Sequence, residues 1–85
     1  MTMKDMLRSY VLENYLFTDD PSALADADSF LDKGIIDSTG IMEIIAFLEV
    51  EFGIVVEDRE MVPENLDSIA SLVAFVERKR AAAES

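Results

Sequence analysis

Apolar side chains recur at helical spacing in three stretches of the chain. The first stretch begins after Thr2, which stands three residues before Asp5, an order typical of a helix N-cap. The apolar positions that follow at three- and four-residue steps are Met3, Met6, Leu7, Tyr10 and Val11. We expect this first helix to end near Phe17, because Pro21 lacks an amide donor and disfavours helical geometry in the residue before it.

The segment from residue 22 to residue 37 has no sustained hydrophobic period. We predict a long but ordered loop, since its apolar residues can be tucked against a core. These residues are Leu24, Phe30, Leu31, Ile35 and Ile36. Gly34 favours a turn just before the next element.

The second stretch carries the clearest helical pattern of the chain. Asp37 or Ser38 can cap its start, and Gly53 favours its end because glycine adopts the left-handed geometry of many helix C-caps. The apolar positions between these caps are Ile41, Ile44, Ile45, Leu48 and Phe52. We predict a helix here that buries one face.

The run from Ile54 to Val56 is β-branched, but the chain has no second candidate strand to pair with it. We therefore predict a buried loop segment, followed by a short helical turn between Glu57 and Met61. The last helix carries Ile69, Leu72, Val73 and Val76, and Asn65, Asp67 or Ser68 can cap it.

This last helix has a basic end that finishes at Arg80, where cations suit the negative end of the helix dipole. We expect residues 81–85 to be a frayed tail and residues 1–80 to form one domain. The pattern as a whole predicts an all-α fold: a small three- to four-helix bundle with a long loop between the first and second helices.

Composition narrows the function classes. The chain of 85 residues has neither cysteine nor histidine, which removes thiol nucleophiles and the commonest general base. Its net charge of −11 repels nucleic acid and anionic lipid and favours basic protein partners. No run approaches the roughly 18 apolar residues of a membrane span. We expect a cytoplasmic protein that is no enzyme, binds no nucleic acid and does not insert into membranes.

Four aspartates, Asp26, Asp28, Asp32 and Asp37, crowd the long loop and raise the question of calcium. A calcium loop starting at Asp26 would place Phe30 and Leu31 where an oxygen ligand and a glycine are required. We predict no metal site.

The candidate chemistry lies at the start of the second helix, where Ser38 directly follows Asp37. A helix N-terminus presents unpaired amide donors and a partial positive charge, which suit a phosphodiester on this serine. The residues alone leave a plain alternative open, in which Asp37 and Ser38 are only a capping pair.

The segment from Gly34 to Ser38 resembles the attachment motif of acyl, peptidyl and aminoacyl carrier proteins. The resemblance covers nearly the whole chain and includes the segment Glu49 to Ile54, near the end of the same helix. Where the family usually has leucine after the serine, this chain has Thr39 followed by Gly40. The two apolar residues before the aspartate are closer to stand-alone aminoacyl and D-alanyl carriers than to typical fatty-acid carriers.

The resemblance implies a bundle of acyl-carrier-protein type in which Ser38 is the covalent attachment site of 4′-phosphopantetheine, transferred from coenzyme A by a phosphopantetheinyl transferase. Asp37 would help to hold metal and phosphate during that transfer. The arm would hold an acyl or aminoacyl group as a thioester, with an amino acid slightly favoured. Implied partners are an adenylating amino-acid or acyl ligase and downstream enzymes that accept the acyl or aminoacyl group, with the carrier itself a monomer.

Two strips of the Ser38 helix are candidate partner contacts. The acidic strip, Glu43, Glu49 and Glu51, can pair with Arg and Lys of partner enzymes, or can simply be a solvated face. The second strip includes Thr39, Met42 and Phe47, next to the core stripe. Met42 and Phe47 either form an exposed apolar contact or pack under the loop.

One functional alternative stays open: an acidic helical adaptor that binds a basic protein and never carries a prosthetic group. Ser38→Ala separates the two hypotheses. In the adaptor it would remove only a cap, about 1 kcal/mol, and leave partner binding intact. In the carrier it would abolish function.

Overall fold

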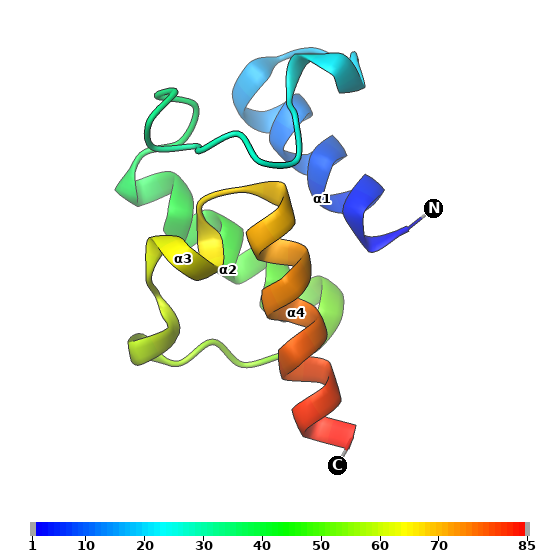
Figure 1. The fold of residues 1–85 in the computed structure, drawn as a ribbon, viewed down its shortest axis with the longest axis vertical. Coiled ribbons are helices and arrows are strands. Elements are labelled where there is room, and N and C mark those ends of the chain that lie inside the picture. The colour runs from blue at the N-terminus through cyan, green and yellow to red at the C-terminus, as the bar shows by residue number, and fades with distance from the viewer. Residues whose placement is uncertain (1, 85) are drawn as a thin grey trace.

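Four α-helices and the loops between them make up the computed structural model, which describes residues 2–84 (Figure 1). The helices are α1 (Met3–Val11), α2 (Ser38–Phe52), α3 (Pro63–Leu66) and α4 (Ile69–Glu84). No strand occurs among these residues, so the predicted all-α bundle is confirmed. The long loop crosses from the end of α1 to the start of α2, and α3 lies beside α2 before the chain turns into α4 (Figure 1).

The start of α1 is held by the capping box that the sequence predicts. Asp5 N donates to Thr2 Oγ1 at 3.1 Å, and Thr2 N donates to Asp5 Oδ2 at 3.4 Å. The helix continues through a π-helical turn, Leu12–Leu16, and ends at Phe17 in left-handed geometry with φ 55°. The predicted end near Phe17 is thus confirmed, while the π-helical turn was not predicted.

The long loop packs into the core, as expected. Leu24, Phe30 and Ile36 are buried, and Gly34 makes the predicted turn with φ 66°. Phe30 N donates to the backbone oxygen of Asp67 at 2.8 Å, which joins the loop to the α3–α4 junction. Leu31 departs from expectation, because its side chain is 43% exposed.

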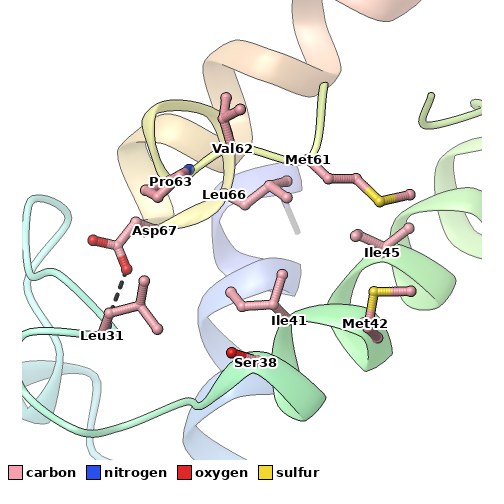
Figure 2. A pocket seen from close by; sticks show the side chains of 10 residues that line it. All are labelled: Leu31, Ser38, Ile41, Met42, Ile45, Met61, Val62, Pro63, Leu66 and Asp67. Atoms are coloured by element: carbon pink, nitrogen blue, oxygen red, sulfur yellow. Dashed lines mark hydrogen bonds between the residues drawn. The ribbon is translucent and has the colours of Figure 1, made fainter. Parts of the chain in front are cut away.

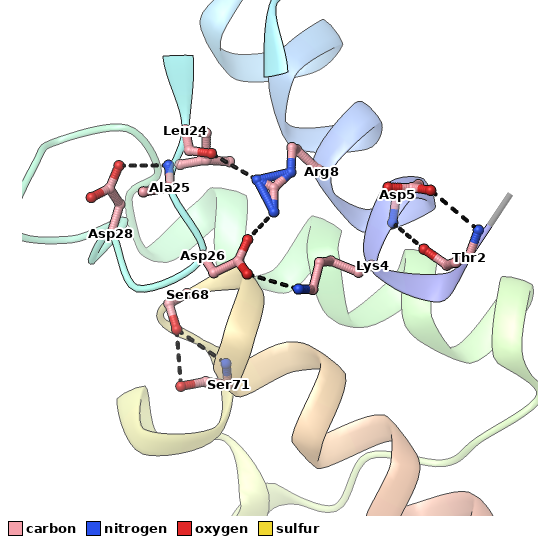
Figure 3. Close-up of polar contacts among 10 residues, drawn as sticks. All are labelled: Thr2, Lys4, Asp5, Arg8, Leu24, Ala25, Asp26, Asp28, Ser68 and Ser71. Atoms are coloured by element: carbon pink, nitrogen blue, oxygen red, sulfur yellow. Dashed lines mark hydrogen bonds and ion pairs between the residues drawn. The ribbon is translucent and has the colours of Figure 1, made fainter. Parts of the chain in front are cut away.

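Two aspartates of the loop, Asp26 and Asp28, are held by hydrogen bonds and ion pairs (Figure 3). Asp26 forms ion pairs with Lys4, at 2.8 Å, and with Arg8. These contacts, the Lys4 hydrogen bond above all, hold the pKa of Asp26 below its ordinary value. Asp28 accepts a hydrogen bond from Ala25 N at 2.9 Å, which lowers its pKa in the same way. Residues 2–84 contain no group of three acidic side chains placed to hold a metal ion.

Besides the loop residues, the core contains Leu7 and Val11 of α1, the predicted stripes of α2 and α4, and the segment between α2 and α3. Ile54 and Val56 are buried while Val55 is exposed, which confirms a buried loop segment. The predicted helical turn appears as a 3₁₀ turn, Asp58–Glu60. The buried side chains of the two long helices are Ile44, Ile45, Leu48, Ile69, Leu72, Phe75 and Val76.

Ser68 caps the start of α4, since its Oγ accepts a hydrogen bond from Ser71 N at 3.1 Å. The expected end of this helix at Arg80 was wrong, since α4 continues to Glu84. Three alanines follow Arg80, and alanine has the highest intrinsic helix propensity. Ser85 lies outside the described residues. No helix among residues 2–84 is long and apolar enough to cross a membrane.

Candidate functional site

Asp37 and Ser38 have different positions at the start of α2. Asp37 has extended geometry, and its Oδ1 accepts a hydrogen bond from Gly40 N at 2.9 Å, so Asp37 is the N-cap. Ser38 is the first helical residue, and its side chain is exposed. Within residues 2–84 its hydroxyl has no hydrogen-bond partner. The alternative in which Ser38 itself caps the helix is therefore excluded.

The surroundings of Ser38 suit a covalently bound phosphate. The first amide groups of a helix have no partner within the helix, and Asp37 satisfies only that of Gly40. The partial positive charge of the 15-residue helix α2 is concentrated at the same end. A phosphodiester on the Ser38 oxygen would meet unpaired donors and a favourable field.

An apolar cavity of about 240 Å³ opens beside Ser38 between α2 and α3 (Figure 2). Its lining residues are Leu31, Ser38, Ile41, Met42, Ile45, Met61, Val62, Pro63, Leu66 and Asp67. Asp67 stands at the end near the loop, where its Oδ1 accepts a hydrogen bond from Leu31 N at 2.9 Å (Figure 2). The sequence did not predict this cavity, because its wall beyond α2 comes from a segment with no helical period.

Tyr15, which sequence reasoning missed, reaches α2 from the π-helical turn. Its hydroxyl donates to Glu43 Oε2 at 2.6 Å and lies 3.4 Å from Gly40 O. Burial first, and then the hydrogen bond to Glu43, raise the pKa of Tyr15 well above its ordinary value. The hydroxyl therefore keeps its proton at neutral pH.

The packing of Tyr15 also explains why position 40 is a glycine, one of the two departures from the motif that the sequence resembles. A Cβ at position 40 would lie 2.5 Å from Ile36 Cγ2 and 3.1 Å from Tyr15 Cε1, so any larger residue would collide with packed side chains. Gly40 is buried, and Tyr15 of the π-helical turn and Ile36 of the loop pack directly against α2 at this point.

Three of the candidate partner contacts are exposed near the start of α2. Thr39 and Glu43 are both exposed, and the Met42 side chain is 56% exposed at the cavity. Thr39 and Glu43 are four residues apart, so they share one face of the helix.

The other three candidates lie further along α2, and two of them contribute to the fold. Phe47 was expected in an exposed patch or under the loop, but it is half-buried and its ring stacks on Tyr10 of α1 with centroids 4.2 Å apart. Its role as a partner contact stays a prediction. Glu49 is half-buried and accepts a hydrogen bond from Val56 N at 3.0 Å. Glu51 is exposed near the last turn.

The fold is similar to that of a known carrier protein. No family model and no curated protein matches the chain. Among solved structures, the solution NMR structure of a holo acyl carrier protein from Nitrosomonas europaea matches with a TM-score of 0.76 and 23% sequence identity. The match covers 95% of this chain and 99% of that chain. The predicted acyl-carrier-protein type of bundle is thereby confirmed.

Proposed function

We propose that this chain is a carrier protein whose Ser38 accepts 4′-phosphopantetheine and presents an acyl or aminoacyl group to partner enzymes. One observation carries the proposal: the Ser38 hydroxyl is exposed at the positive end of α2 and forms no hydrogen bond within residues 2–84, while Asp37 is the N-cap. The structural relative, itself named a holo acyl carrier protein, supports it. The chain holds and presents its cargo and does not catalyse.

The attachment step uses coenzyme A as the donor and a phosphopantetheinyl transferase as the enzyme. The Ser38 oxygen forms a bond to the phosphorus of the pantetheine phosphate, and the phosphoanhydride bond of coenzyme A breaks. Adenosine 3′,5′-bisphosphate leaves, and the serine proton passes to a base of the transferase or to water. When attached, the arm supplies the thiol, absent from this chain, that holds cargo as a thioester.

The residues around Ser38 fit this group. The first amides of α2 and the helix dipole stabilise the negative phosphodiester, and Asp37 keeps the first turn folded while helping to hold metal and phosphate during transfer. Ser38 is exposed, so a transferase can reach its hydroxyl.

The cavity beside Ser38 is apolar and measures about 240 Å³, so an apolar amino-acid side chain or a short acyl chain fits inside it. From this cavity and from the Gly34 to Ser38 sequence, we propose that the cargo is an amino acid or a short acyl group. An adenylating ligase supplies the cargo, and downstream enzymes remove it. The carrier acts as a monomer in this proposal. Its cytoplasmic location remains a prediction from the sequence.

A thiol assay on the full chain tests the carrier function. Incubation with coenzyme A and a broad-specificity phosphopantetheinyl transferase, followed by removal of coenzyme A, should create one titratable thiol per chain. The untreated chain gives no signal because it has no cysteine. If several transferases create no thiol, the carrier proposal fails and the unmodified acidic adaptor becomes the better account.

The cargo class is tested separately by loading the chain from acyl and aminoacyl thioesters of coenzyme A with the same transferase. A small apolar aminoacyl or acyl group should raise the unfolding temperature more than a long acyl chain, because the small group can be buried whole in the cavity while the end of a long chain stays in water. A larger increase with the long chain would contradict the small-cargo proposal and leave the carrier function standing.

A further inference from the structure

Glu43 is the one exposed carboxylate of α2 whose position is fixed by another helical segment. Tyr15 Oη donates to its Oε2 at 2.6 Å, a length typical of a charge-assisted hydrogen bond from a hydroxyl to a carboxylate. Within the described part of the chain Glu43 forms no ion pair, and its second oxygen accepts no hydrogen bond. The carboxylate is therefore held in place yet free to accept a cation from outside.

The other two acids of α2 lack this combination. Glu49 is half-buried, and its carboxylate is engaged by Val56 N at 3.0 Å. Glu51 is exposed but has no partner among residues 2–84, so no contact fixes its side chain. Of the three, Glu43 alone is both oriented and accessible.

The position of Tyr15 is itself fixed by packing. Its ring lies against Gly40, where a Cβ would come within 3.1 Å, and meets the Tyr10 ring edge-on at 6.2 Å. Its hydroxyl is protonated at neutral pH, as that of any tyrosine is, and burial and the Glu43 contact raise its pKa further. The Tyr15 hydroxyl is thus a well-fixed hydrogen-bond donor that reaches α2 from the π-helical turn after α1.

An oriented carboxylate is a better target for a cation than a mobile one. A free glutamate loses side-chain entropy when a partner binds it, whereas Glu43 has already lost part of that freedom in the unbound chain. Glu43 shares its helix face with Thr39, next to Ser38. A protein whose cation pairs with Glu43 therefore contacts α2 within the first two turns, close to Ser38.

We propose that Tyr15 is a positioning residue that orients Glu43 to receive an arginine or lysine of the phosphopantetheinyl transferase that modifies Ser38. This inference rests on the proposed carrier function. It makes the first helical segment part of the recognition surface, although none of its residues belongs to the attachment motif.

Steady-state kinetics of phosphopantetheine transfer test this role on the full chain, with coenzyme A and a broad-specificity transferase. Tyr15→Phe keeps the ring against Gly40 and removes only the donor. It should raise the KM for the carrier about fivefold and leave kcat within about twofold, because it weakens docking rather than chemistry. Glu43→Gln should raise KM at least as much, and its effect should shrink at high salt.

A double-mutant cycle separates this role from a general effect on the fold. If Tyr15 acts through Glu43, Tyr15→Phe should cause no further rise in KM in the Glu43→Gln background. Glu51→Gln is the matched control, since it removes an exposed charge of the same helix that Tyr15 does not touch. In that background the fivefold effect of Tyr15→Phe should persist.

The outcomes distinguish this inference from the proposed function. If the wild-type chain takes up no phosphopantetheine, the carrier proposal fails and this inference fails with it. If the wild-type chain is modified and Tyr15→Phe leaves KM unchanged, only the inference is overturned. An equal rise in KM in the Glu43→Gln and Glu51→Gln backgrounds would also overturn it.

Discussion

The two ends of α2 use similar residues for different purposes. At the first end, Asp37 and Gly40 satisfy the cap and the packing, which leaves the Ser38 hydroxyl without a structural role. At the last end, Gly53 adopts left-handed geometry, and Glu49 is bound to the chain that follows. The comparison indicates that the Ser38 hydroxyl stays accessible because its neighbours provide the cap and the packing at that end of the helix.

The largest expected effect on stability comes from Gly40→Ala. In an exposed helix this change would stabilise by up to about 1 kcal/mol. Here the new Cβ would lie 2.5 Å from Ile36 Cγ2, so we expect a destabilisation of about 1–3 kcal/mol from overpacking. Urea unfolding measures it. A more stable variant would contradict the close approach of the loop and Tyr15 to α2.

Gly53→Ala tests the other end, where the reason for glycine is different. Nothing lies within 4 Å of the added Cβ, but φ is 66°. We expect a loss of about 1 kcal/mol from backbone strain alone. Gly53→Asn should lose less, because asparagine tolerates left-handed geometry. Equal losses for alanine and asparagine in thermal unfolding would argue against this explanation.

A smaller difference should separate Glu49→Ala from Glu51→Ala. Both changes raise helix propensity slightly, so their difference isolates the hydrogen bond from Val56 N. We expect Glu49→Ala to be less stable than Glu51→Ala by about 1 kcal/mol. Equal unfolding free energies for the two variants would mean that the hydrogen bond from Val56 N to Glu49 does not stabilise the fold.

The smallest effect concerns acid and the loop that leads into α2. The pKa of folded Asp26 is lowered, so between the folded and unfolded pKa values the unfolded chain binds more protons. The stabilisation from Asp26 is therefore complete above the unfolded pKa of about 3.9 and is lost as pH falls through the folded pKa. Asp26→Asn should flatten the loss of stability below about pH 4 in unfolding curves. An unchanged slope would mean that Lys4 and Arg8 contribute nothing there.

Local patterns predicted most of the fold and the candidate site at Asp37 and Ser38. The capping box at Thr2, the stripe from Ile41 to Leu48 and the glycine at position 53 are each specified by neighbouring residues. Contacts between distant segments were not predictable in this way. The stack of Phe47 on Tyr10 and the bond from Tyr15 to Glu43 depend on how α1 crosses α2, which no local period encodes.

The same limit explains the cavity beside Ser38. Its wall opposite α2 is formed by Met61 to Leu66, and this segment contains only the four-residue helix α3. So short a helix shows no hydrophobic period, and its position depends on tertiary contacts such as the hydrogen bond from Asn65 Nδ2 to Glu60 O at 2.9 Å.

The central claim is tested most directly by intact mass and urea unfolding of three proteins: wild type, Ser38→Ala and Thr39→Ala. After coenzyme A and a broad-specificity transferase, wild type and Thr39→Ala should each gain one phosphopantetheinyl group, and Ser38→Ala none. The unfolding free energy of Ser38→Ala should stay within about 0.5 kcal/mol of wild type, because the Ser38 hydroxyl is exposed and forms no hydrogen bond within residues 2–84. Addition to Ser38→Ala, or no addition to wild type, would contradict the account.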